Sequence, residues 1–201
     1  MAKKTAIVLH LVPLPAFADR DLYDIVGAME RGTHFPLPLG ATGNQWFVNL
    51  DGVVNYNGSE DYIGSYAQLF RSTAIEGVAT MQEASGHPAF EGIAFANMIV
   101  GAARQYVDVI RSLEGGLPIF VMLSLCGAER CHMRYEIQPG AGWMLSRVLN
   151  RSVLSLPEVT LLGDGDDPAV ILRPVFNMLW NAFGFLRSPM YNQSGEWIGV
   201  A

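Results

Sequence analysis

The sequence predicts one globular α/β domain over residues 1–201, with a mixed central sheet, hairpin strands and at least two packed helices. Half of the 201 residues are hydrophobic and 16% are charged, so the chain can bury a large core and is not intrinsically disordered. Short apolar runs typical of strands lie on both sides of a long segment whose apolar residues recur every three or four positions, as in a helix. These two patterns together predict strands covered by helices.

The first strand is predicted over residues 6–12, a run rich in β-branched residues that ends at a proline. The same region has features of a secretory signal peptide, because two lysines precede the apolar run and A-F-A at 16–18 is typical of a cleavage site. A histidine and two prolines interrupt the apolar run and favour the strand. Both interpretations of residues 6–18, core strand and export signal, stay open at this point.

A short helix is expected over residues 19–31, followed by a strand-rich region. Alternating residues at 46–50 and 53–56 flank Asp51-Gly52, a dipeptide typical of a two-residue type I′ hairpin turn. Two more strand-like runs follow at 62–70 and 74–81, and the second of these also allows a helix. This region therefore predicts a set of consecutive antiparallel strands.

The strongest helix is predicted over about residues 90–113, where two neighbouring apolar stripes indicate burial on most sides. Glycines at 115 and 116 end it. The continuous apolar run at 119–125 is then typical of a central strand.

Further strands are expected at 134–138 and 155–162. A final helix is predicted over about 168–183, with Asp167 as its N-cap and Gly184 as its stop signal.

Composition and charge limit the classes of function that the chain can have. A net charge of −6 with only two lysines gives no general field for nucleic acid, and no apolar run reaches the ~18 residues of a membrane span. Cys126 and Cys131 are spaced C-x4-C, unlike zinc or redox motifs, and are expected to be reduced thiols of a cytoplasmic protein. An acidic cluster at 164–167 is assigned to helix capping. We therefore expect no metal and no cofactor.

Five phrases occur in order along nearly the whole chain: A-I-V-L-H-L-V-P-L-P-A-F (6–17), N-L-D-G-V (49–53), S-Y-A-Q-L-F-R-S-T-A-I-E-G-V (65–78), P-I-F-V-M-L-S-L-C-G-A (118–128) and L-R-P-V-F-N-M-L-W-N-A-F-G-F-L-R-S-P-M-Y-N-Q-S-G-E-W (172–197). Their order and content resemble the carboxy-terminal region of bacterial proteins with an amino-terminal Schlafen-type, AlbA-like domain. That family is labelled as ATP-binding or DNA-binding. The AlbA-like domain itself has no counterpart in this chain, so the resemblance implies nucleic acid as a partner only through such a separate domain. Whether the chain is a fragment of a longer protein stays open.

Three residues are candidates for a site. Arg71 and Glu76 are expected to pair across the turn between two strands, where an arginine–carboxylate pair holds a phosphate-bearing ligand or locks the hairpin. His10 lies in an apolar strand. It serves as a general base if a carboxylate such as Glu76 or Asp51 meets it, and otherwise is a buried neutral histidine.

A basic neighbourhood contains Arg130, Arg134, Arg147 and Arg151, but two glutamates dilute it. The leading hypothesis is a non-catalytic accessory domain for assembly, partner docking or regulation, working as a homo-oligomer or with a protein partner. One alternative is a hydrolase or nucleotide-binding enzyme that uses His10, Arg71 and Glu76. Another alternative is a weak nucleic-acid binder.

Overall fold

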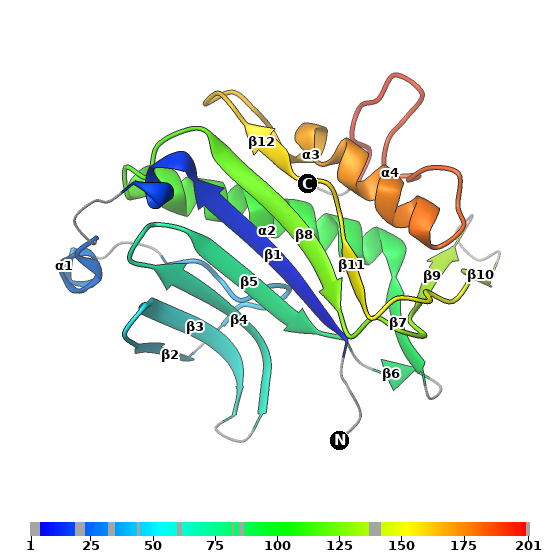
Figure 1. The fold of residues 1–201 in the computed structure, drawn as a ribbon, viewed down its shortest axis with the longest axis horizontal. Helices are drawn as coiled ribbons and strands as arrows, with labels where there is room; N and C mark the ends of the chain where they lie inside the picture. The colour runs from blue at the N-terminus through cyan, green and yellow to red at the C-terminus, as the bar shows by residue number, and fades with distance from the viewer. Residues whose placement is uncertain are drawn as a thin grey trace.

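The computed structural model describes residues 5–18, 23–31, 35–43, 45–59, 62–81, 83–84, 87–136 and 142–199. Its main feature is an antiparallel sheet in which the first strand of the chain lies between strands that follow much later (Figure 1). The strand order is β11-β8-β1-β5-β4-β3-β2, and β12 also pairs with β8. The bounds are β1 (Ala6–Pro13), β2 (Gln45–Val48), β3 (Gly52–Ser59), β4 (Tyr62–Phe70), β5 (Ile75–Thr80), β8 (Ile119–Cys126), β11 (Val153–Ser155) and β12 (Val159–Leu161).

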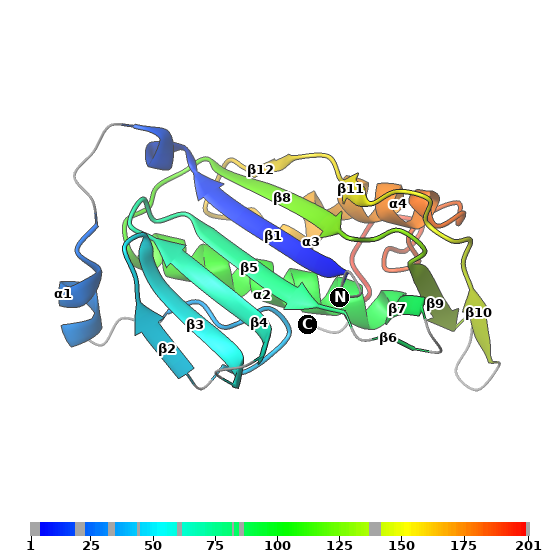
Figure 2. The ribbon, with the colours of Figure 1, turned by 60° about the horizontal axis from the view of Figure 1, so that its bottom comes forward.

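A second, smaller sheet lies at one end of the molecule (Figure 2). Its order is β10-β9-β7-β6, and β7 and β9 are parallel. The bounds are β6 (Glu83–Ala84), β7 (His87–Glu91), β9 (His132–Glu136) and β10 (Trp143–Leu145).

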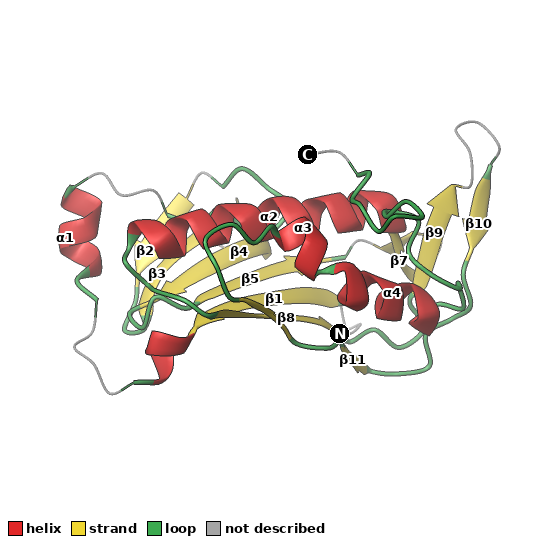
Figure 3. Cartoon of the chain, turned by 90° about the horizontal axis from the view of Figure 1, so that it is seen from above, coloured by secondary structure: helices red, strands yellow, loops and turns green. Residues whose placement is uncertain are grey.

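The helices cover one face of the main sheet. The long helix α2 (Gly92–Ser112) runs along this face, and α3 (Pro168–Ile171) and α4 (Arg173–Ala182) pack beside it on the same side (Figure 3). The short helix α1 (Ile25–Glu30) lies beside one end of the sheet, and the 3-10 helix η1 (Leu14–Phe17) follows β1. Among the described residues, no helix combines the length and the apolar character needed to cross a membrane.

The core lies between the sheet and α2. Burial alternates along β1, β5 and β8, so that every second side chain faces α2 and is buried, while the others lie on the opposite face and stay partly exposed. We call these the inner and the outer face of the sheet. The inner side chains Leu9, Leu11 and Leu123 are 0–1% exposed. The predicted α/β fold is therefore confirmed, and residues 6–12 and 119–125 are strands as expected. The structure adds that these two strands are neighbours in the centre of the sheet.

Several predicted boundaries need correction. The helix predicted from residue 90 begins at Gly92, because β7 extends to Glu91, whose side chain accepts hydrogen bonds from the amides of Ile93 and Ala94. The final helix is broken into α3 and α4 at Leu172, because Pro174 has no amide hydrogen to continue the helical ladder. Pro157 likewise separates the strand predicted at 155–162 into β11 and β12.

Two local predictions in the first half also change. The β2–β3 hairpin has a four-residue loop rather than the predicted two-residue turn, because Val48 pairs with Val53. Asn49 shapes this loop by accepting hydrogen bonds from the amides of Asp51 and Gly52 through its side chain. The helix expected over 19–31 is shorter and comprises Ile25–Glu30, whereas residues 19–22 lie outside the described part of the chain. The ambiguous run at 74–81 is a strand.

Candidate functional site

The structure brings two of the three predicted site residues together on the outer face of the sheet. His10 of β1 lies directly opposite Glu76 of β5 in the strand register. Nε2 of His10 is 2.7 Å from Oε2 of Glu76, and the Tyr66 hydroxyl of β4 donates to Oε1 of the same carboxylate, also at 2.7 Å. One carboxylate therefore joins side chains from three adjacent strands, and we call these residues the His10–Glu76–Tyr66 cluster.

Strand alternation explains why the three side chains meet. Residues opposite each other in an antiparallel pair project from the same face of the sheet, and diagonal neighbours are within reach of long side chains. Glu76 is opposite both His10 on β1 and Gln68 on β4, and Tyr66 is the diagonal neighbour two residues from Gln68. Tyr66 is not among the residues predicted from the sequence. It can be identified only when the β4–β5 register is known, because alternate residues of β4 then project from the same face as Glu76.

The contacts within the cluster shift the pKa values of Glu76 and Tyr66. The hydrogen bond from His10 lowers the pKa of the Glu76 carboxyl below its ordinary value, assisted by the bond from Tyr66 and opposed by partial burial. Burial, followed by the hydrogen bond to Glu76, raises the pKa of Tyr66. The side chains of His10 and Glu76 are 37% and 24% exposed. Glu76 is thus held as a carboxylate that accepts from both neighbours.

Arg71 lies apart from this cluster. Its Nε donates to the carbonyl of Leu50 at 3.0 Å, and its amide donates to the carbonyl of Asp51. Arg71 therefore ties the turn between β4 and β5 to the β2–β3 hairpin, and the predicted pairing with Glu76 is wrong. The β4–β5 register places Gln68 opposite Glu76, whereas Arg71 lies three residues further on, in the turn. Asp51 belongs to the hairpin loop, so Glu76 is the carboxylate that meets His10.

The surroundings of the cluster are mostly apolar. The apolar outward side chains near it are Val8 and Val12 of β1, Val78 of β5, and Phe120 and Met122 of β8, all partly exposed. Two polar side chains also project from this face, Gln68 opposite Glu76 and Ser124 opposite Val8. Among the described residues only the short η1 covers part of this face, where the ring of Phe17 contacts that of Phe120 (Figure 3). The outer face is therefore a mostly apolar surface with one hydrogen-bonded polar cluster near its centre.

Other candidate features have structural roles in the part of the chain that the structure describes. Asp167 caps α3 and forms a two-point ion pair with Arg104, while Asp166 accepts from the amides of Leu162 and Gly163. No group of three or more histidine, cysteine or acidic side chains in the described ranges could hold a metal ion.

Neither cysteine forms a disulfide, and burial raises the pKa of the Cys131 thiol to about 12. Of the four arginines in the basic neighbourhood, Arg130, Arg147 and Arg151 are exposed on loops and Arg134 is in β9.

The chain matches no protein-family model, no curated protein and no solved structure. The resemblance to the region that follows Schlafen-type AlbA-like domains therefore stays a prediction.

Proposed function

We propose that this chain is a non-catalytic assembly domain in which the outer face of the main sheet packs against the same face of a second copy. The observation that carries the proposal is that a face formed by three central strands is mostly apolar and, in the described structure, is covered by no more than the short η1 at one end. Soluble antiparallel sheets usually place polar side chains on a face that contacts water. An apolar outer face instead indicates a surface that is covered in an assembly.

The charge distribution supports a second copy as the partner. The chain carries a net charge of −6, which opposes association of two copies through most of its surface. Near the centre of the outer face the acidic group is Glu76, and its charge is shared with two hydrogen-bond donors. Two such faces can therefore meet with each carboxylate hydrogen-bonded to two side chains of its own sheet.

The geometry also suits this arrangement. Two sheets that pack face to face lie about 10 Å apart, with the outward side chains of each filling the gap. Val8, Val12, Val78 and Met122 supply the apolar side chains, and the cluster lies among them. A twofold axis that lies in the plane between the two faces, parallel to both sheets, generates a closed dimer from a single self-complementary patch.

The test is sedimentation velocity of the purified chain over a wide range of concentration. The wild type is expected to form a dimer whose fraction rises with concentration. Met122→Glu places a charge in the proposed interface and is expected to raise the dimer dissociation constant by about tenfold or more. Leu186→Glu is the matched control, because Leu186 is 92% exposed and lies after α4 on the helix side.

A wild type that remains monomeric at every concentration would overturn the proposal. A dimer that responds equally to Met122→Glu and Leu186→Glu would also overturn it, since the outer face would then have no special role. Circular dichroism of each variant establishes that the fold is retained.

The enzyme alternative has support from one contact only, the hydrogen bond between His10 and Glu76. An imidazole held by a carboxylate is a common general base. Arg71 lies elsewhere, however, and donates to the backbone carbonyl of Leu50. The assembly domain is therefore the function that we propose.

A further inference from the structure

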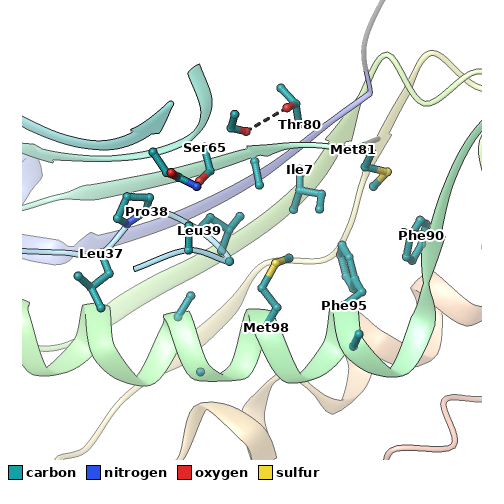
Figure 4. A pocket seen from close by; sticks show the side chains of 18 of the residues that line it. Ile7, Leu37, Pro38, Leu39, Ser65, Thr80, Met81, Phe90, Phe95 and Met98 are labelled. Carbon is teal, nitrogen blue, oxygen red and sulfur yellow. Dashed lines mark hydrogen bonds between the residues drawn. The ribbon is translucent and has the colours of Figure 1, made fainter. Parts of the chain in front are cut away.

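A large cavity lies on the opposite side of the sheet from the proposed interface. It has a volume of about 940 Å³ and is bounded by the first half of α2, the segment 37–41, and the ends of β3, β4 and β5. Figure 4 shows Phe95 and Met98 of α2 pointing from one wall toward Ile7 and Leu39. A cavity of this size is within the range that small-molecule sites occupy, ~300–1,000 Å³.

The helix sequence leaves the space open. Ala94, Met98, Gly101 and Gln105 follow one another at intervals of four, three and four residues and therefore share one face of α2. Two of these four side chains are very small, and a Cβ atom added at Gly101 would meet no atom within 4 Å. On the sheet side, Ala79 is likewise small. The cavity is thus a consequence of small residues at facing positions on two elements.

The lining is almost free of charge. Glu91 is the one charged side chain among the described residues that line the cavity, and both of its oxygens accept from amides at the start of α2. No cationic side chain of the described lining is available to pair with an anion. An anionic ligand would therefore lose its hydration without compensation, and it would also approach the carboxylate of Glu91.

The walls also carry polar groups. Ser65 of β4 is 7% exposed, and its hydroxyl makes no hydrogen bond to the residues that the structure describes. Asn57 of β3 also lines the cavity, and its side chain is exposed. These groups can orient a ligand that carries a single uncharged polar group, such as a hydroxyl or an N–H.

From this geometry we infer a binding site for an uncharged, mostly apolar small molecule in the cavity between α2 and the sheet. The site is separate from the proposed dimer interface, which uses the outer face of the same sheet. The two proposals therefore succeed or fail independently.

The test compares two fluorescent probes that share a framework. N-phenyl-1-naphthylamine is uncharged and has one N–H group, whereas 1-anilinonaphthalene-8-sulfonate has the same rings and an anionic sulfonate. The uncharged probe is expected to bind with saturable, one-to-one stoichiometry. The sulfonate is expected to bind about tenfold more weakly or worse, because the described lining offers it no counter-charge.

Variants at Gly101 locate the binding. Gly101→Leu and Gly101→Trp place progressively larger side chains at the cavity without meeting a neighbouring atom at Cβ, and both replace a glycine within a helix, so folding is retained. They are expected to weaken binding of the uncharged probe in that order, by about tenfold or more for tryptophan. Asp108→Leu is the control, because Asp108 is exposed on the same helix and does not line the cavity.

Equal binding of the two probes would overturn the inference, as would equal affinities of the Gly101 variants and the wild type for the uncharged probe. Loss of binding in Met122→Glu but not in Gly101→Trp would also overturn it, because the probe would then occupy the outer face. Melting curves without probe show that each variant is folded.

Discussion

Glu76 accepts hydrogen bonds from two neighbouring strands at once, so β1, β4 and β5 are joined through one side chain as well as through their backbones. Glu76→Gln removes the charge and places an N–H₂ group opposite a donor. We expect the free energy of unfolding to fall by about 1–3 kcal/mol, the range for lost hydrogen bonds to a charged, partly buried group. Urea unfolding measures it. Glu158→Gln on an exposed loop is the control, and equal stability of the two variants would contradict the expectation.

The hydrogen bonds of Glu76 also predict that the stability of the folded chain depends on pH. Hydrogen bonds from His10 and Tyr66 lower the pKa of Glu76 in the folded chain from the model-peptide value of 4.5. A group with a depressed folded pKa contributes stability that is fully present above its unfolded pKa and is lost as pH falls through the folded pKa. The stability difference between wild type and Glu76→Gln should therefore shrink as pH falls below about 4.5. A difference that grows as pH falls from this value would disprove this assignment.

At this scale the sequence identifies residue types but not all of their partners. His10 and Glu76 are recognisable because each is an isolated polar residue in an apolar strand. The two side chains meet because β1 pairs with β5. A long connection separates these strands, and the local pattern of apolar residues does not reveal which strands pair. The pairing predicted between Arg71 and Glu76 fails because the strand register places Gln68 opposite Glu76, while Arg71 lies in the turn and donates to the carbonyl of Leu50.

Asp167 connects two helices, since it caps α3 and pairs with Arg104 of α2. Asp167→Ala removes the cap and both ionic hydrogen bonds. We expect a loss of about 1–2 kcal/mol, because a cap contributes ~1 kcal/mol and a solvent-screened ion pair adds a smaller amount. Thermal unfolding measures it. Asp164→Ala should change stability by less than about 0.5 kcal/mol, because the Asp164 side chain is 88% exposed. Equal losses in both variants would contradict the role of Asp167.

Replacing glycine by alanine is expected to have opposite effects on stability at two positions of α2. Gly101→Ala adds a methyl group that meets no atom within 4 Å, so the better helix propensity of alanine should stabilise the chain by roughly 0.5–1 kcal/mol. Gly92→Ala places Cβ 2.9 Å from the ring of buried Trp180 and should destabilise it. The melting temperatures of the two variants measure these effects. If both temperatures rise or both fall, the contacts of the added methyl group do not determine the change in stability.

Helices and strands with a regular pattern of apolar residues are predictable from the sequence. The points at which such elements are broken are harder to predict. The stripes at 90–113 identify α2, and the alternating run 62–70 matches β4. The predictions at 155–162 and 168–183 each cross a proline, and the observed elements divide near it. The second sheet is also absent from the sequence analysis as a unit. Its β7–β9 pair is parallel and joins residues on either side of α2, a contact that no local pattern records.

The whole molecule has two dissimilar faces. The face with helices contains the core and the cavity, and the outer face of the sheet carries the His10–Glu76–Tyr66 cluster (Figure 3). We therefore expect Met122→Glu to leave probe affinity unchanged and Gly101→Trp to leave the dimer fraction unchanged, because distant sites without shared partners behave additively. Measuring both properties in the double variant tests this. If the effects of the two substitutions differ from additivity by more than about 0.5 kcal/mol, binding at one face is energetically coupled to the other face.

The central position of β1 has a consequence for synthesis of the chain. β1 is synthesised before both of its partners, β5 and β8, and the Thr5 hydroxyl bonds to a carbonyl 122 residues later. Such distant contacts impose slow folding, because a long loop must close before they form. Until β8 emerges from the ribosome, the apolar residues of β1 have a free strand edge on one side. The nascent chain therefore presents an aggregation-prone strand while residues 14–126 are translated, and chaperones that bind extended apolar segments are expected to recognise residues 6–13 during this interval.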